Sequence, residues 1–166
     1  MQHNALILLG TNLGNRQQNL MAATGAIRTF LGSVEKQSHI YESEPWGRGH
    51  QPMFYNQALQ IVTPCTALET LHHIKQIEFL LGRERKERWA PRTIDIDILF
   101  FDDLQVESPI LTIPHPQLHL RKFTLDPLNE MVPDYMHPVL KKTIAELWYE
   151  CEDVLKVTTL DLAYQY

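Results

Sequence analysis

The stretch RWAPRTIDIDILFF, residues 88–101, contains the pattern that decides the fold. Its second half alternates isoleucine with aspartate before an apolar run, which is typical of a strand with one buried face. Side chains two residues apart on a strand share a face, so Asp95 and Asp97 project together while the neighbouring isoleucines face the core. The sequence therefore predicts a strand that presents two carboxylates side by side.

A helix is predicted upstream of this strand. Residues 66–82, TALETLHHIKQIEFLLG, begin with Thr66 and have Glu69 three residues later, which is the spacing of a capping box. Apolar residues then recur at helical intervals until Gly82. Towards the N-terminus, the other predicted elements are a strand at 54–62, a strand at 34–42, a helix at 15–32 and a strand at 5–10.

The resulting order is βαββαβ, two split β-α-β units. This order predicts an α+β protein with a ferredoxin-like core, in which helices back an antiparallel sheet. Residues 104–123 are predicted to form short strands and irregular chain, and residues 141–150 a further helix, as a C-terminal extension. A length of 166 residues with 44% hydrophobic content fits one domain, so residues 1–166 are expected to form a single domain.

Composition argues against two classes of partner. A net charge of -5 gives the chain no general attraction for nucleic acid or for an anionic membrane. Its two cysteines, Cys65 and Cys151, lie far apart, which is typical of reduced thiols rather than of a disulfide framework. The apolar run at 5–9 is too short for a signal peptide or a membrane span, so we expect a cytoplasmic protein.

The two aspartates are candidate metal ligands. Carboxylates held this close raise each other's pKa unless a cation lies between them. Mg²⁺ suits such a pair, because it commonly takes one or two protein carboxylates and completes its shell with water and substrate phosphates. A D-x-D pair alone is a weak signal, and an edge strand with two solvated acids is the alternative interpretation.

The loop before the strand strengthens the metal interpretation. Its five basic residues stand against two acidic ones, Glu84 and Glu87. Guanidinium groups match phosphate oxygens, and their combination with a metal-binding acid pair is what phosphoryl transfer requires. A solvated loop is the alternative for such charges, and the sequence has no P-loop signature. The five basic residues are Arg83, Arg85, Lys86, Arg88 and Arg92.

Four stretches carry a family resemblance: GTNLGNR at 10–16, PWGRGHQPMFYNQAL at 45–59, LLGRERKERWAPRTIDIDILFFDD at 80–103 and IPHPQLHLRKFTLDPLNEMVP at 113–133. Together they strongly resemble the 6-hydroxymethyl-7,8-dihydropterin pyrophosphokinase family (HPPK), in the right order. The resemblance implies a single HPPK-type catalytic domain, a monomer, that transfers the pyrophosphoryl group of ATP to the hydroxymethyl oxygen of the pterin and releases AMP. It also implies two Mg²⁺ ions, and ATP and the pterin as small-molecule partners.

The resemblance assigns residues at the phosphate end of the site. Asp95 and Asp97 match the family's magnesium ligands, and Arg83 and Arg92 match arginines that grip the phosphates and support transfer. These four are the predicted catalytic residues. The predicted ATP-binding residues are Glu78, Arg85, Arg88, Trp89, Ile98, Thr112, His115 and Arg121.

The resemblance also assigns residues at the pterin end. Phe54 and Phe123 match the two rings that sandwich the pterin, Asn56 the amide that reads its polar edge, and Ser43 and Trp46 the loop that completes the pocket. A flat heteroaromatic ring gains stacking energy from phenylalanine on both sides, and an amide offers both a donor and an acceptor. Without the resemblance, the two phenylalanines would be interpreted as core residues.

The predicted reaction is an in-line attack of the hydroxymethyl oxygen on the β-phosphorus of ATP, with no side chain standing out as general base. Two other classes of protein remain as alternatives. An RNA-binding module would suit the strand order and the basic loop, but it calls for a basic surface and exposed aromatic residues in an RNP pattern. A non-catalytic nucleotide-binding regulator would keep the arginines but need no metal pair.

Overall fold

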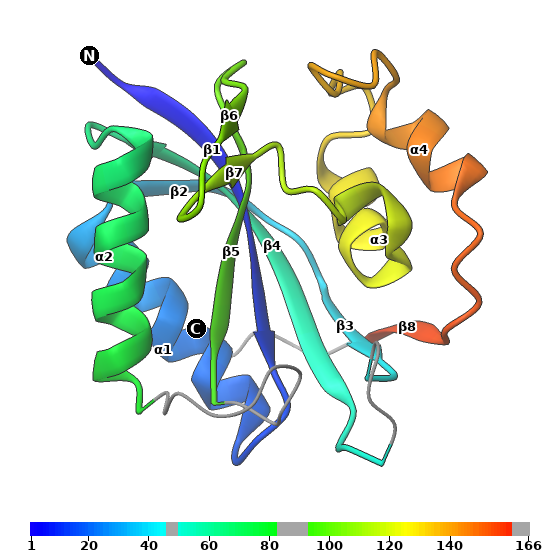
Figure 1. Ribbon diagram of the computed structural model, residues 1–166. Helices are drawn as coiled ribbons and strands as arrows, with labels where there is room; N and C mark the ends of the chain where they lie inside the picture. Colours follow the sequence, from blue (N-terminus) through cyan, green and yellow to red (C-terminus); the bar gives the residue numbers. More distant parts are fainter. Residues whose placement is uncertain (46–49, 83–92, 161–166) are drawn as a thin grey trace.

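The computed structural model describes residues 1–45, 50–82 and 93–160, and its centre is an antiparallel sheet (Figure 1). The first strand, β1 (His3–Thr11), lies between β4 (Phe54–Thr63) and β5 (Asp95–Phe101) and is antiparallel to both. On its other side β4 pairs with β2 (Ser33–Gln37) and β3 (Ile40–Ser43), and β3 pairs with β8 (Val157–Leu160). The order across the described sheet is β5-β1-β4-β3-β8, with β2 beside β4.

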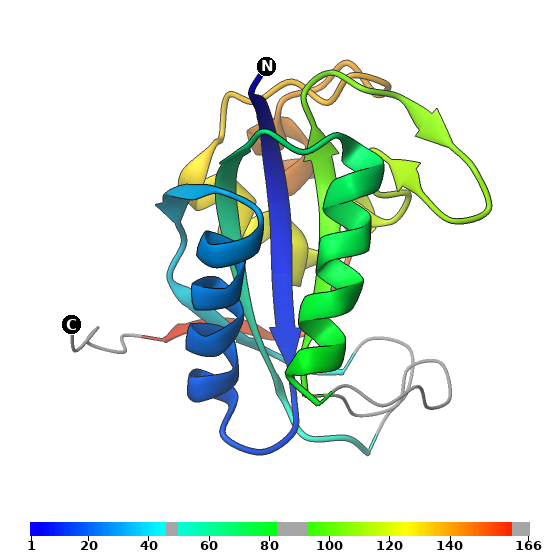
Figure 2. The same ribbon diagram turned by 90° about the vertical axis from the view of Figure 1, so that its left-hand side faces the viewer.

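Helices cover both faces of this sheet. One face carries α1 (Arg16–Phe30) and α2 (Ala67–Leu80), and the other carries α3 (Lys122–Met131) and α4 (Ile144–Glu150), as Figures 1 and 2 show. The predicted capping box of Thr66 and Glu69 begins α2, and a second one at Thr143 begins α4. Two short strands, β6 (Val106–Glu107) and β7 (Thr112–Ile113), and a 3₁₀ turn (Leu118–Leu120) connect β5 to α3.

The core divides into two clusters, one on each face of the sheet. Along β1, Ile7 and Leu9 pack with the α1 and α2 side, whereas Leu6 and Leu8 pack with the α3 and α4 side. This alternation is the expected result of a strand buried on both faces. In β5 the register shifts opposite Leu6 and Ile7, so that Leu99 and Phe100 both enter the α3 cluster.

The structure confirms the predicted antiparallel sheet backed by helices and corrects the prediction in three places. The strand expected at 34–42 is two strands, because the chain is interrupted at Ser38, whose hydroxyl accepts a hydrogen bond from the backbone N–H of Ala58 at 3.0 Å. The helix α3 and the strand β8 were not expected from the sequence. In the described ranges, no helix is both long enough and apolar enough to cross a membrane.

Candidate functional site

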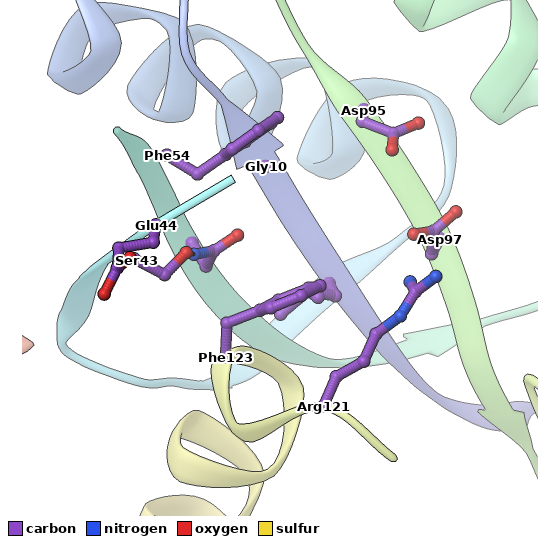
Figure 3. Close-up of a pocket in the computed structure, with 10 residues that line it drawn as sticks. Gly10, Ser43, Glu44, Phe54, Asp95, Asp97, Arg121 and Phe123 are labelled. Atoms are coloured by element: carbon purple, nitrogen blue, oxygen red, sulfur yellow. Dashed lines mark hydrogen bonds between the residues drawn. The ribbon is translucent and has the colours of Figure 1, made fainter. Parts of the chain in front are cut away.

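A pocket that is partly open to solvent lies on the α3 face of the sheet (Figure 3). Its floor comes from β1, β4 and β5, and its walls come from the end of β3 and the start of α3. The lining residues are Leu8, Gly10, Ser43, Glu44, Phe54, Asn56, Asp95, Asp97, Arg121 and Phe123. Seven of the residues predicted for the site therefore meet in one cavity, namely Ser43, Phe54, Asn56, Asp95, Asp97, Arg121 and Phe123.

Asp95 and Asp97 form the acidic end of the pocket. Both are half-buried and project from β5 into the cavity, while Ile96 between them is 4% exposed on the opposite face. In the pairing of β5 with β1, Asp95 lies opposite Gly10 and Asp97 lies opposite Leu8. The strand periodicity in the sequence predicted this arrangement correctly.

Glu78 supports the same strand from α2. Its side chain is 3% exposed, and its carboxylate accepts a hydrogen bond from the backbone N–H of Ile96 at 3.1 Å. The ammonium group of Lys75, one turn earlier, lies 3.3 Å from the other carboxylate oxygen. Glu78 therefore holds the backbone between the two aspartates, and its predicted contact with the nucleotide stays a prediction.

Arg121 adds a positive charge at the acidic end. It stands immediately before α3, is 7% exposed, and points its guanidinium towards Asp97 in Figure 3. Its guanidinium donates a hydrogen bond to the side-chain oxygen of Gln117 and lies 5.5 Å from the centre of the Phe123 ring. The arginine is therefore held between the aromatic and the acidic parts of the pocket.

His115 lies near the acidic end of the pocket, and its imidazole is neutral. Burial and the charge of Arg121 lower the pKa of its imidazole to about 4, against a smaller opposing effect of Asp95. The backbone N–H of Gln117 donates to Nδ1 at 3.2 Å, so the ring proton lies on Nε2. A neutral histidine with a fixed tautomer is a hydrogen-bond donor rather than a second positive charge.

Phe54 and Phe123 form the aromatic end of the pocket. Phe54 begins β4 and Phe123 is the second residue of α3, and Figure 3 shows the two rings on opposite sides of the cavity. Asn56, 2% exposed, lies on the floor, where its amide donates to the hydroxyl of Ser43 at 2.7 Å. Because the NH₂ group is engaged with Ser43, the amide oxygen is left for the pocket side. A flat ring with polar edges fits between these residues.

Two groups of contacts outside the lining hold the walls. On α3, Glu130 accepts a hydrogen bond from the hydroxyl of Tyr41 at 3.0 Å and one from the backbone N–H of His39 at 3.0 Å, and it also contacts the His39 imidazole. Burial and the nearby Glu130 carboxylate raise the pKa of Tyr41 to about 12, so its hydroxyl stays a donor. These contacts fasten α3 to β3.

On the opposite face of the sheet, Arg16 fastens the ends of the strands. Its guanidinium lies 3.0 Å from the carboxylate of Glu42, donates to the carbonyl of Met53 at 2.8 Å, and lies 3.8 Å from the centre of the Tyr55 ring. Sequence reasoning gave Arg16 no role, although it ends the stretch GTNLGNR. The residues Leu8, Gly10 and Glu44 of the pocket were also missed, and Gly10 is the first residue of that stretch.

The other predicted residues are placed as follows. The side chain of Ile98 is 5% exposed in the core cluster on the α1 and α2 side, and Thr112 is half-buried in β7. Both side chains lie outside the pocket lining. Six predicted residues lie outside the described part of the chain: Trp46, Arg83, Arg85, Arg88, Trp89 and Arg92.

The acidic end fits an oxygen-binding cation that shares its shell with a ligand. No group of three or more histidine, cysteine, aspartate or glutamate residues that could hold a metal occurs within residues 1–45, 50–82 and 93–160. A dedicated protein cage is therefore not present in this part. Two carboxylates on one face of a strand suit Mg²⁺, which commonly takes one or two protein carboxylates and the oxygens of a phosphate substrate.

Comparison with known protein families connects this geometry to a reaction. The model of the family described as 7,8-dihydro-6-hydroxymethylpterin-pyrophosphokinase (HPPK) matches residues 6–133. Two similar relatives are named 2-amino-4-hydroxy-6-hydroxymethyldihydropteridine pyrophosphokinase. The protein of Aquifex aeolicus is 38% identical over 148 residues, 89% of this chain and 91% of that protein. The protein of Bacillus subtilis is 41% identical over 132 residues, 79% of each chain.

Solved structures share the fold. The crystal structure of wild-type Plasmodium falciparum HPPK-DHPS with SDX-DHP matches with a TM-score of 0.70 and 23% identity, over 89% of this chain and 43% of that chain. A triple mutant of the same protein with STZ-DHP matches with a TM-score of 0.77 and 22% identity, over 90% of this chain and 43% of that chain. The chain thus spans less than half the length of these two structures, and at this identity the likeness extends to the fold.

Proposed function

Because this chain belongs to the 7,8-dihydro-6-hydroxymethylpterin-pyrophosphokinase family, its function is pyrophosphoryl transfer in folate biosynthesis, and we propose how its residues carry the reaction. ATP supplies the pyrophosphoryl group, the hydroxymethyl group of 6-hydroxymethyl-7,8-dihydropterin accepts it, and AMP is released. The pocket then has two ends for two substrates. The aromatic end takes the pterin and the acidic end takes the phosphates.

At the aromatic end, the pterin ring stacks between Phe54 and Phe123. Offset stacking on both faces fixes the plane of the ring. Asn56 reads the polar edge with its amide oxygen, because Ser43 already engages its NH₂ group at 2.7 Å. Trp46 completes this end of the site, as the family resemblance implies.

At the acidic end, Asp95 and Asp97 would hold the two Mg²⁺ ions that the family resemblance implies. Bound there, Mg²⁺ would neutralise phosphate charge and make the hydroxymethyl oxygen a better nucleophile. Arg121 provides a buried guanidinium beside the aspartates, and Arg83 and Arg92 grip the phosphates during transfer. His115, neutral with its proton on Nε2, donates a hydrogen bond to the nucleotide.

The same resemblance assigns five further residues to the ATP site, namely Arg85, Arg88, Trp89, Ile98 and Thr112. Of these, Ile98 can contribute only its backbone, since its side chain lies in the core.

The transfer is an in-line displacement at the β-phosphorus. The hydroxymethyl oxygen forms a bond to that phosphorus, and the bond from it to the oxygen bridging the α-phosphate breaks. AMP leaves with the bridging oxygen, and the hydroxyl proton passes to water. The role of the protein is to align the two substrates and to stabilise the phosphate charge.

The remaining proposals concern the whole molecule. Both core clusters pack on one sheet, which supports a single catalytic domain over residues 1–166. Cys65 and Cys151 are free thiols, which supports a reducing, cytoplasmic location. We expect the enzyme to act as a monomer on these two small molecules.

The proposal depends on one observation. A single cavity is lined at one end by Phe54, Phe123 and the Asn56 amide, and at the other end by Asp95 and Asp97. Measurement of AMP release from ATP tests it, with pterin and Mg²⁺ each added or left out. AMP should form only when both are present. AMP without pterin would point to a different phosphate reaction, and binding of ATP without turnover would favour a nucleotide-binding regulator.

A further inference from the structure

The floor of the pocket is open at one position of β1. Gly10 lines the cavity and lies opposite Asn56 on β4 and opposite Asp95 on β5. Residues directly opposed in antiparallel strands project to the same face, so these three positions form a row across the floor (Figure 3). Two residues earlier, the corresponding position of β1 is Leu8, whose buried side chain closes the floor next to Asp97.

The folded protein itself does not require glycine at this position. A Cβ on Gly10 would lie 3.5 Å from the amide oxygen of Asn56 and 3.8 Å from a ring carbon of Phe54, which are ordinary van der Waals separations. Its backbone φ also lies outside the left-handed region, in contrast to that of Gly14 at 65°. Alanine would therefore fit the pocket when no ligand is bound.

We propose that Gly10 is a positioning and specificity-determining residue, whose bare backbone is the surface over which the hydroxymethyl arm of the pterin crosses β1. The inference rests on the proposed function, in which Asn56 reads the pterin ring and Asp95 serves the phosphates. Neighbouring strands lie about 4.8 Å apart, so these two side chains are separated by about two strand spacings. The ring read by Asn56 and its short hydroxymethyl arm together cover that separation, and Gly10 lies between its two ends.

A methyl group at this position would occupy the volume of the arm. The hydroxymethyl oxygen would be displaced from its line with the β-phosphorus, and small displacements of this kind are costly for transfer. The ring slot between Phe54 and Phe123 would keep its walls. A side chain at position 10 should therefore weaken the binding of pterins that carry a substituent at the position of the arm. Pterins without that substituent should bind as before.

The test is the variant Gly10→Ala, with Gly25→Ala as matched control. Gly25 is an exposed residue of α1, and a Cβ there would meet nothing within 4 Å. Steady-state kinetics give kcat and KM, and calorimetry without nucleotide compares 6-hydroxymethylpterin with pterin unsubstituted at that carbon. For Gly10→Ala we expect kcat/KM for the substrate to fall at least about tenfold and 6-hydroxymethylpterin to bind more weakly. Binding of unsubstituted pterin, the KM for ATP and all values for Gly25→Ala should match wild type.

Three results would overturn the inference. Wild-type kinetics for Gly10→Ala would show that the arm does not pass over this residue. Equal weakening of both pterins would show that the methyl group disturbs the ring slot instead, and a variant that fails to fold would show that the fold needs glycine. Wild-type enzyme that releases no AMP with pterin would refute the proposed function itself, which separates the two failures.

Discussion

Glu78 of α2 accepts a hydrogen bond from the backbone N–H of Ile96, the residue between the two aspartates of the pocket. β5 is the edge strand of the described sheet, so the glutamate takes the place of a neighbouring strand at this point. The carboxylate is 3% exposed, and water does not readily replace it. The direction of Asp95 and Asp97 thus depends on a side chain from the opposite face.

Replacement of Glu78 by alanine should destabilise the protein. The backbone N–H of Ile96 would be left buried and unpaired, which costs about 1–3 kcal/mol of the free energy of unfolding. Glu78→Gln keeps an acceptor for this N–H and should lose less. Urea denaturation measures both, with Lys75→Ala as a control for the ion pair, in which the ammonium group is exposed and the carboxylate is buried. A larger loss for glutamine than for alanine would refute the role of the hydrogen bond.

Asp97→Asn should remove turnover while the pocket stays folded. Asparagine keeps the size of the side chain but lacks the negative charge that a divalent cation requires. We expect kcat to fall at least about a hundredfold, since several kcal/mol of charge stabilisation are lost. Calorimetry with pterin alone should give the wild-type affinity. Asp103→Asn makes the same change at an exposed turn residue and should leave kcat unaltered.

Phe123→Leu should weaken the binding of pterin and leave that of ATP unchanged. Leucine fills part of the space but cannot stack, and the loss of an aromatic pair reduces affinity about tenfold. Fluorescence titration with pterin measures the effect. The control is Phe30→Leu at the end of α1, where the side chain is 45% exposed. If Phe123→Leu binds pterin as tightly as wild type does, the ring does not lie against Phe123.

The stability of the metal-free protein should rise with pH through the titration of His115. Its pKa falls from 6.5 to about 4 on folding, so between these values the unfolded chain binds more protons than the folded one. The stabilisation is therefore complete above about pH 6.5 and is lost as the pH falls towards 4. Denaturation at pH 7.5 and pH 5 should show a smaller difference for His115→Asn than for wild type. His72→Asn, at an exposed position of α2, controls for the removal of a histidine.

Local patterns in the sequence predict the elements well where the pattern is complete. The alternation around Asp95 and Asp97 is strong enough to indicate both the strand and its two faces, and the Thr66 capping box marks the beginning of α2. Local pattern does not predict helix α3, because Pro127 lies in its interior, where proline normally argues against a helix. Tertiary packing overrides that local signal, since Leu125 and Leu128 are fully buried in the core.

Positions that depend on strand pairing are harder to predict. Leu8 and Gly10 belong to a buried strand in the sequence, and nothing local shows that they form the floor of a pocket. Their role follows from the register, which places them opposite Asp97 and Asp95. Glu78 is similar, since its bond to the backbone of β5 joins residues 18 positions apart in the chain.

The attachment of Glu130 to Tyr41 and His39 fixes the position of the pocket wall that carries Phe123. Phe123 and Glu130 belong to the same short helix, so Phe123 cannot move away from the strands without breaking the hydrogen bonds to Tyr41 and His39. The gap between Phe54 and Phe123 is consequently set in the folded protein. A dihydropterin ring is close to flat, whereas a fully reduced ring puckers at its saturated carbons and is thicker. Because this gap is fixed in the folded protein, we expect it to accept flat rings more readily than puckered ones.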